Sequence, residues 1–152
     1  VVLRTLSKAH ALAAARIGVA LAAPSIIGLL RRIVAPYPLP QACVAAALAA
    51  LSPLAVARSQ ENIKRVCEQR ERLRSLCETL PAVLSILASE ANFLTLRLHN
   101  AAAAYAALSA AGIIVRNLAR YPGLENALRV TVGTEAENLA VVAVLKSLDA
   151  QA

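Results

Sequence analysis

The sequence is poor in aspartate and aromatic residues, and it has no tryptophan or methionine. It has sixteen Lys and Arg residues against nine acidic ones, of which only Asp149 is an aspartate, so its formal net charge is +7. A charge of this sign is typical of proteins that bind nucleic acid or anionic membranes. With only three Tyr and one Phe, however, the chain has little aromatic surface on which bases could stack. We therefore expect no nucleic-acid partner.

The densest basic segment, KRVCEQRERLR over residues 64–74, does not change this expectation. Its basic residues alternate with Glu68 and Glu71, a pattern typical of the solvated face of a helix. One alternative stays open: a non-catalytic module that binds DNA or a membrane surface through this helix. Such binding would be sensitive to salt.

The sequence also lacks metal-binding and disulfide patterns. The three cysteines, Cys43, Cys67 and Cys77, are odd in number and show no CxxC spacing. This favours buried or incidental thiols in a reducing compartment. The two histidines, His10 and His99, are far apart in the chain and have no ligand-like neighbours, so we expect no metal site.

No long apolar run is present. The most apolar part, residues 9–30, is interrupted by Arg16, Gly18 and Pro24. It therefore lacks the ~20 consecutive apolar residues that a membrane-spanning helix needs. The first residues do not follow the pattern of a signal peptide. We expect a soluble, cytoplasmic protein with no membrane partner.

The 152 residues, 59% of them hydrophobic, are enough for one domain with a packed core. We expect strands over residues 1–6, 16–22, 82–87, 92–98, 113–118 and 128–133. We expect helices over residues 24–34, 41–51, 53–80, 100–111 and 134–149, the last opening with a capping box of Thr134 and Glu137. The part after residue 81 predicts a compact α+β unit. The two strands of the first half cannot bury both faces of a sheet by themselves, as if the chain began inside a larger sheet.

Lys8 lies in an apolar run, TLSKAHALAAARIG over residues 5–18, where a surface lysine is not expected. Burial favours the neutral amine, which forms a Schiff base with an aldehyde such as pyridoxal phosphate. Ser7 and Arg16 offer donors for a cofactor phosphate, and they converge with Lys8 if the chain turns between the first two strands. The alternative is a lysine that snorkels from a strand end, with Arg16 paired to a carboxylate.

Five motifs carry a resemblance to a known family. They are TLSKAHALAAARIG, APYPLP, SEANFLTLRL, AAGIIVRNL and LRVTVGTEAEN, and they occur in the family's order along essentially the whole chain. The sequence resembles the class II pyridoxal-phosphate-dependent aminotransferases of fold type I, and most closely the histidinol-phosphate aminotransferase family. Three positions depart from the usual pattern: His10 stands where Phe is commoner, and Ala11 and Ala14 replace frequent glycines.

The resemblance implies which residues bind the cofactor, pyridoxal 5'-phosphate. Lys8 matches the catalytic Schiff-base lysine, which also moves a proton between the substrate's α-carbon and the cofactor. Ser7 and Arg16 match the residues that contact the cofactor's phosphate.

The resemblance also implies three substrate-binding residues. Arg129 matches the arginine that binds the substrate carboxylate, Arg116 matches the arginine associated with the substrate phosphate, and Asn92 lies in a motif that borders the active site. Each arginine lies on an expected strand among aliphatic residues, where an unpaired guanidinium is costly, so a bound anion is a sensible partner. An ion pair with Glu125 or Glu90 is the alternative.

The resemblance implies an α/β fold and a division of the chain. Residues 1–23 would be the C-terminal remnant of the cofactor-binding large domain, residues 24–80 interdomain helices, and residues 81–152 the small C-terminal domain. In this family the aspartate that keeps the cofactor's ring nitrogen protonated lies upstream, and Asp149, at the end of the last expected helix, cannot be that residue. We therefore expect a C-terminal portion that is inactive by itself.

The implied activity is that of a histidinol-phosphate transaminase in histidine biosynthesis. It transfers an amino group between L-histidinol phosphate and 2-oxoglutarate, giving imidazole-acetol phosphate and L-glutamate, and the family implies a homodimer. Three alternatives stay open: an aromatic aminotransferase, a threonine-phosphate decarboxylase and an inactive remnant.

Overall fold

The structure, a computed structural model, describes residues 1–149. The chain folds as two compact units, unit 1 (Val1–Ile63) and unit 2 (Lys64–Ala152). The long helix α3 (Pro53–Glu78) contributes its first residues to unit 1 and its remainder to unit 2.

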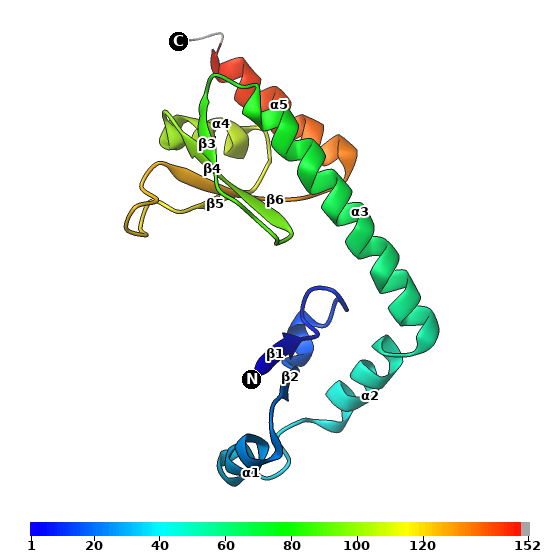
Figure 1. Cartoon of the computed structure of the whole chain (residues 1–152). Helices are drawn as coiled ribbons and strands as arrows, with labels where there is room; N and C mark the ends of the chain where they lie inside the picture. Colours follow the sequence, from blue (N-terminus) through cyan, green and yellow to red (C-terminus); the bar gives the residue numbers. More distant parts are fainter. Residues whose placement is uncertain (150–152) are drawn as a thin grey trace. The chain divides into compact units, whose positions relative to one another are not determined.

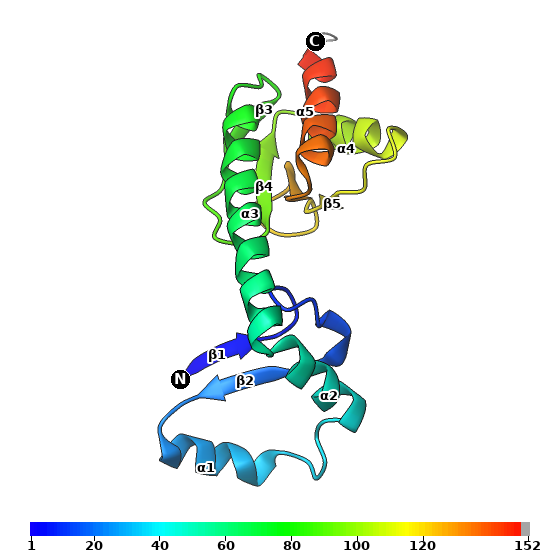
Figure 2. The same cartoon turned by 90° about the vertical axis from the view of Figure 1, so that its right-hand side faces the viewer.

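Unit 1 is built around a two-stranded ladder. Strands β1 (Val2–Thr5) and β2 (Gly18–Leu21) pair antiparallel, as Figure 2 shows, with Val2 opposite Leu21 and Thr5 opposite Gly18. The connection contains a short 3₁₀ helix, η1 (Ala13–Ala15). Helices α1 (Pro24–Ile33) and α2 (Gln41–Ala50) follow, and α1 has the expected proline in its first turn, where no backbone N–H is needed.

Few apolar side chains of unit 1 are buried. Leu6 and Ile17 are each 7% exposed, whereas Leu3 is 76% exposed and Ile33 80% exposed. All four residues of β1 are exposed. The expectation that these two strands cannot bury both faces of a sheet is confirmed, because a two-stranded ladder has too little surface to form a core.

Unit 2 contains a four-stranded antiparallel sheet in the order β3-β4-β6-β5 (Figure 1). Its strands are β3 (Val83–Ile86), β4 (Phe93–Leu98), β5 (Arg116–Asn117) and β6 (Ala127–Thr131). Helix α4 (Ala101–Ala110) follows β4, and α5 (Glu135–Asp149) follows β6. The expected α+β unit is confirmed.

The core of unit 2 follows from the two-residue period of its strands. Leu94, Leu96 and Leu98 on β4 are at most 1% exposed and form one cluster with buried residues of α3, α4, α5 and β6. The intervening residues of β4, among them Thr95 and Arg97, therefore lie on the opposite face of the sheet, which carries polar side chains.

The helix expected over residues 100–111 is confirmed as α4, and one expected strand is much shorter. Asn100 caps α4 by accepting a hydrogen bond from Ala103 N (3.0 Å), and Gly112 has φ +74°, a conformation that glycine adopts without strain. The strand expected over residues 113–118 is only Arg116–Asn117. Residues 113–115 lie outside the ladder, although the register would place residues 114 and 115 opposite Thr131 and Val130 of β6.

The capping box of α5 is present. Thr134 N donates to Glu137 Oε2 (2.7 Å), and Glu137 N donates to Thr134 Oγ1 (3.4 Å). Thr134 Oγ1 also donates to Glu137 Oε2 (2.8 Å), and the two hydrogen bonds that this carboxylate accepts from Thr134 hold the pKa of Glu137 below its ordinary value.

Within residues 1–149, no single helix is long and apolar enough to cross a membrane. Helices α2 and α3 meet the length and composition requirements only as a pair, and the chain bends by 71° between them.

Candidate active site

Ser7 and Arg16 lie on the two sides of the loop end of the β1–β2 ladder. The pairing continues past Thr5 and Gly18, because Leu6 N donates to Ile17 O (3.3 Å). The residues that follow on the two sides are Ser7, which precedes Lys8, and Arg16, whose left-handed backbone (φ +53°) ends the ladder. The expectation that the chain turns between the two strands is confirmed.

The loop that carries Lys8 is closed by backbone hydrogen bonds. Ala11 N donates to Lys8 O (3.1 Å) and Leu12 N donates to Leu6 O (3.1 Å). The buried Ser59 of α3 donates from its hydroxyl to Ala9 O. Lys8 is therefore held between a strand end and a loop tied to a helix.

Two residues of this loop adopt left-handed backbone conformations. Ala11 has φ +54° and Arg16 has φ +53°. Ala11 is one of the two positions where the family more often has glycine, and its positive φ gives a physical reason for that preference. Ala14, the other, lies in η1 and has no positive φ.

The expectation that Lys8 is buried is wrong for this chain. Lys8 is exposed, Ser7 is half-buried and Arg16 is exposed. The reason is that β1 and β2 have no other strand beside them among the described residues, so no second layer covers the end of the ladder. The guanidinium of Arg16 bends back, and its Nη1 donates to Ala13 O (3.1 Å). Among residues 1–149 it forms no ion pair, so the carboxylate partner considered in the alternative is absent.

A recess of about 240 Å³ lies beside the Lys8 loop, within unit 1. Its lining includes His10, Ala11, Arg58, Ser59 and Asn62. His10 Nδ1 is buried and has no hydrogen-bond partner in the described part of the chain.

Arg116 and Arg129 are direct neighbours on the sheet of unit 2. Arg116 on β5 is opposite Arg129 on β6, and Arg129 is in turn opposite Thr95 on β4. Opposed residues of a ladder project to the same face, so both arginines lie on the polar face of the sheet. Arg129 is half-buried, its Cζ lies 5.0 Å from the centre of the Phe93 ring, and its Nε is buried without a partner in residues 1–149.

Arg116 is exposed and bonds to a tyrosine. Its Nη2 donates to the Tyr121 hydroxyl (2.8 Å), and Arg120 Nη2 donates to the same oxygen (3.3 Å). Arg120 and Arg116 together lower the pKa of Tyr121, because both hydrogen bonds favour the phenolate.

The ion pairs considered for these arginines do not form. Glu90 lies 3.9 Å from Arg70, and Glu125 accepts a hydrogen bond from Gly123 N (2.8 Å). Within the described residues neither Arg116 nor Arg129 pairs with a carboxylate, so both remain free to bind an anion.

Asn92 ends the loop between β3 and β4. Its side chain is exposed, and its backbone oxygen accepts a hydrogen bond from Val132 N (2.9 Å), which extends the β4–β6 ladder by one pair.

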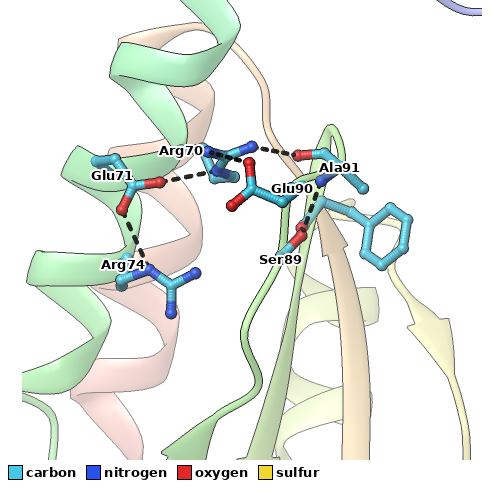
Figure 3. Close-up of polar contacts among 7 residues, drawn as sticks. Arg70, Glu71, Arg74, Ser89, Glu90 and Ala91 are labelled. Carbon is cyan, nitrogen blue, oxygen red and sulfur yellow. Dashed lines mark hydrogen bonds and ion pairs between the residues drawn. The ribbon is translucent and has the colours of Figure 1, made fainter.

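Arg70 of α3 fixes this loop, and the sequence did not single it out. It is 8% exposed although it belongs to the segment expected to be a solvated helix face, so that expectation is wrong at this position. Its Nε donates to Glu71 Oε1 (2.8 Å) and its Nη1 donates to Ala91 O (3.2 Å), as Figure 3 shows. The bond to Glu71 raises the pKa of Arg70, and the Arg70 guanidinium lowers the pKa of Glu71.

The structure therefore brings the candidate residues together in two groups. Ser7, Lys8 and Arg16 all lie at the loop end of the ladder in unit 1. Arg116 and Arg129 meet on the sheet of unit 2, close to the strand that begins after Asn92.

Comparison with known proteins identifies the family. The description of the matching family is "Aminotransferase class I and II", and the match covers residues 1–145. The chain is 47% identical over 151 residues to a histidinol-phosphate aminotransferase of Stenotrophomonas maltophilia, covering 99% of this chain and 42% of the relative. It is 42% identical over 148 residues to the enzyme of that name in Aeromonas hydrophila, covering 97% of this chain and 42% of the relative.

Solved structures agree. The histidinol-phosphate aminotransferase of Clostridium acetobutylicum has a TM-score of 0.83 at 21% identity, covering 99% of this chain and 46% of that one, which shows a shared fold. The histidinol-phosphate aminotransferase of Sinorhizobium meliloti, in complex with pyridoxal-5'-phosphate, has a TM-score of 0.75 at 27% identity and covers 99% of this chain and 41% of that one. The chain thus spans about two fifths of the length of its relatives, has the α/β fold of the type I pyridoxal-phosphate-dependent transferases over that part, and belongs to the class I and II aminotransferase family.

Proposed function

We propose that this chain is the C-terminal portion of a histidinol-phosphate transaminase, which exchanges an amino group between L-histidinol phosphate and 2-oxoglutarate. The observation that carries the proposal is the pair Arg116 and Arg129. These two cations are adjacent on one sheet face, and neither has a carboxylate partner in the described residues. A substrate pair with one phosphate and several carboxylates suits two such arginines. The names of the most similar relatives support the same activity.

The residues of unit 1 fit pyridoxal phosphate as the cofactor. The Lys8 side chain is exposed and the other donors of Arg16 have no partner among residues 1–149. Ser7 and Arg16 lie on the two sides of the loop end of the ladder, so a hydroxyl and a guanidinium are available there as donors for a phosphate. When bound, this cofactor supplies an aldehyde for covalent linkage to an amine and a ring that accepts the electron pair released at the substrate's α-carbon.

Each candidate site residue then has a defined role. Lys8 would hold the cofactor through its Nζ, and would move a proton between this Nζ and the α-carbon of the substrate. Ser7 and Arg16 bind the cofactor phosphate. Arg129 binds the α-carboxylate of glutamate or 2-oxoglutarate, and Arg116, held by Tyr121, binds the phosphate of the other substrate.

Asn92 borders the substrate, at the end of the loop that leads into β4.

The family resemblance also suggests how the whole enzyme is organised. Residues 1–23 would complete a large cofactor-binding domain, residues 24–80 would connect it to a small domain, and residues 81–152 would form that small domain. The enzyme would act as a cytoplasmic homodimer.

A chimera tests the proposal. In the Stenotrophomonas maltophilia relative, the segment that matches this chain is replaced by residues 1–152, and the purified protein is assayed with L-histidinol phosphate and 2-oxoglutarate. Turnover that is lost on Lys8→Ala, but not on Lys64→Ala, is the expected result. A folded chimera that binds the cofactor but does not turn over histidinol phosphate contradicts the proposal.

The same chimera distinguishes the related activities. A threonine-phosphate decarboxylase would release carbon dioxide from phosphothreonine, and an aromatic aminotransferase would prefer phenylalanine over histidinol phosphate. The L-threonine-O-3-phosphate decarboxylase of Porphyromonas gingivalis has a TM-score of 0.76 at 20% identity, which shows a shared fold alone. The isolated 152-residue chain is expected to be inactive with every one of these substrates.

A further inference from the structure

We propose that Arg70 is a positioning residue for substrate binding. It holds the β3–β4 loop against α3, so that the Phe93 ring after that loop supports Arg129. The inference rests on the proposed function only in assigning the substrate carboxylate to Arg129. It gives a role in substrate affinity to a side chain that lies on a helix, outside the two groups of candidate residues.

The burial of Arg70 requires an explanation. Its side chain is only 9% exposed, and a buried guanidinium is costly unless charged or polar partners surround it. For packing alone an apolar side chain of similar length would serve as well. The partners of Arg70 are Glu71 Oε1 at 2.8 Å, Ala91 O at 3.2 Å and Glu90 Oε2 at 3.9 Å. Two of these three belong to the β3–β4 loop.

The loop that Arg70 binds is stiffened from within. Ser89 Oγ donates to Phe93 O (2.6 Å) and accepts from Ala91 N (3.1 Å), so one hydroxyl closes the turn (Figure 3). Arg70 then connects this closed turn to α3 through Ala91 O. A shift of Ala91 would move Asn92 and Phe93 with it, because the three residues are consecutive and Ser89 Oγ bonds both Ala91 N and Phe93 O.

Phe93 transmits the position of the loop to Arg129. Its residue pairs with Thr131 in the β4–β6 register, and its ring faces the guanidinium of Arg129 at 5.0 Å. A cation over an aromatic ring is attracted by the ring's quadrupole, and the attraction depends on the ring's orientation. Since Arg129 has no ion pair among residues 1–149, the ring is the contact that orients it.

The residue of α3 that precedes Arg70, Gln69, is bonded to the segment that follows β6. Gln69 Oε1 accepts a hydrogen bond from Asn138 Nδ2 (3.2 Å), and Asn138 binds both the N–H and the oxygen of Gly133 (2.9 and 3.2 Å). Val132 N, beside Gly133, donates to Asn92 O. Two consecutive residues of α3 thus fix both chain segments that flank Arg129.

Arg72 offers a matched control two residues away. It lies on the same helix and pairs with Glu135 at 2.8 Å, but both side chains are 52% exposed. It contacts no residue of the β3–β4 loop through this pair. Replacing Arg72 with Met removes the same charge from the same helix and leaves the loop bonded.

The experiment compares Arg70→Met, Arg70→Lys and Arg72→Met in the chimera described above. For Arg70→Met we expect KM for L-glutamate to rise by roughly tenfold with kcat little changed, because the loss is in carboxylate binding rather than in proton transfer. Arg70→Lys should recover part of the loss, since an ammonium can still donate to Ala91 O. Arg72→Met should leave both constants unchanged.

Two results overturn the inference. One is an unchanged KM in a folded Arg70→Met chimera. The other is an equal fall of activity in Arg70→Met and Arg72→Met that follows their thermal stability, since that would be a general loss of folding. An Arg70→Met chimera that does not fold is replaced in this comparison by Arg70→Lys, judged by the same KM.

A second measurement needs no catalytic activity, so the proposed function and the present inference can fail separately. The rate at which phenylglyoxal modifies Arg129 is measured by peptide mass spectrometry in the 152-residue chain and in its Arg70→Met and Arg72→Met variants. Faster modification in Arg70→Met alone supports the role of Arg70 even if the chimera does not use glutamate. Equal rates in the two variants overturn it.

Discussion

Replacing Ala11 with glycine should stabilise the loop that carries Lys8. Ala11 has φ +54°, which is the left-handed region, and its N–H closes the turn by donating to Lys8 O at 3.1 Å. A residue with a Cβ is strained in this conformation because the Cβ approaches the following carbonyl oxygen. Ala11→Gly removes that contact and leaves the hydrogen bond in place.

The size of the effect follows from two opposing terms. The left-handed conformation costs a non-glycine residue about 1–2 kcal/mol. Glycine has more conformational freedom in the unfolded loop, and losing it on folding opposes the stabilisation by about 0.5–1 kcal/mol. The net stabilisation is therefore ~0.5–1 kcal/mol, which corresponds to a roughly two- to fivefold change in the opening equilibrium.

Amide hydrogen exchange measures this equilibrium directly. The reporters are the amides of Ala11 and Leu12, which donate to Lys8 O and Leu6 O within the loop. Under conditions where opening is fast, their protection factors should rise by roughly two- to fivefold in Ala11→Gly. The matched control is Ala14→Gly, because Ala14 lies in η1 without a positive φ and glycine there should cost ~0.5–1 kcal/mol.

The two substitutions must therefore change protection in opposite directions. If Ala11→Gly lowers the protection of both amides, the backbone strain inferred for Ala11 is absent. If both variants change it equally, the exchange reports the flexibility of glycine alone.

Two further predictions concern titratable groups in unit 2. Burial raises the pKa of the Cys77 thiol to about 11, so at pH 8 Cys77 should react with a disulfide reagent much more slowly than the exposed Cys67. For the same reason the free energy of unfolding should fall as the pH rises from ~8.5, the ordinary thiol value, toward 11. Thiol labelling read by mass spectrometry checks the first prediction and urea unfolding across this pH range checks the second, and equal labelling rates would contradict the burial. The pKa of Glu137 is lowered by its hydrogen bonds to Thr134, so its contribution to stability is present above ~4.3 and disappears as the pH falls through its folded value. Glu137→Gln keeps an acceptor for the cap but should flatten the pH dependence of urea unfolding between about pH 5 and 3, and an unchanged slope in the variant would refute the assignment.

Much of the secondary structure was predictable from the sequence because its signals are local. Pro24 begins α1 and Thr134 with Glu137 begins α5, as their positions along the chain indicate. The alternation of leucines in residues 94–98 gave β4 and its buried face. The length of β5 was overestimated, because apolar β-branched residues such as those of 113–115 favour an extended chain but do not show whether it stays hydrogen-bonded to a neighbouring strand.

The candidate site residues came from motifs, and their grouping came from the structure. Nothing in the sequence states that Arg116 lies opposite Arg129, since the ladder register joins residues thirteen positions apart, or that Ser7 and Arg16 lie at one end of a ladder. The exposure of Lys8 was mispredicted for a related reason. Apolar neighbours in sequence bury a side chain only if other elements cover them, and no second layer covers this end of the ladder within residues 1–149.

Arg70 shows most clearly which property the sequence predicts and which one only the fold decides. By sequence it is one of several arginines in a charged helix. Arg72, two residues later, is half exposed, as expected for an arginine on a solvated helix face. Only the return of the chain at Glu90 and Ala91, about twenty positions later, buries it and gives it partners. The sequence by itself determined the helices, the strands, the turn residues and the family, because periodicity, caps and motifs are written in neighbouring residues. The tertiary structure decided which charges are buried, paired or left free to bind an anion, because burial and pairing depend on segments that meet only when the chain folds.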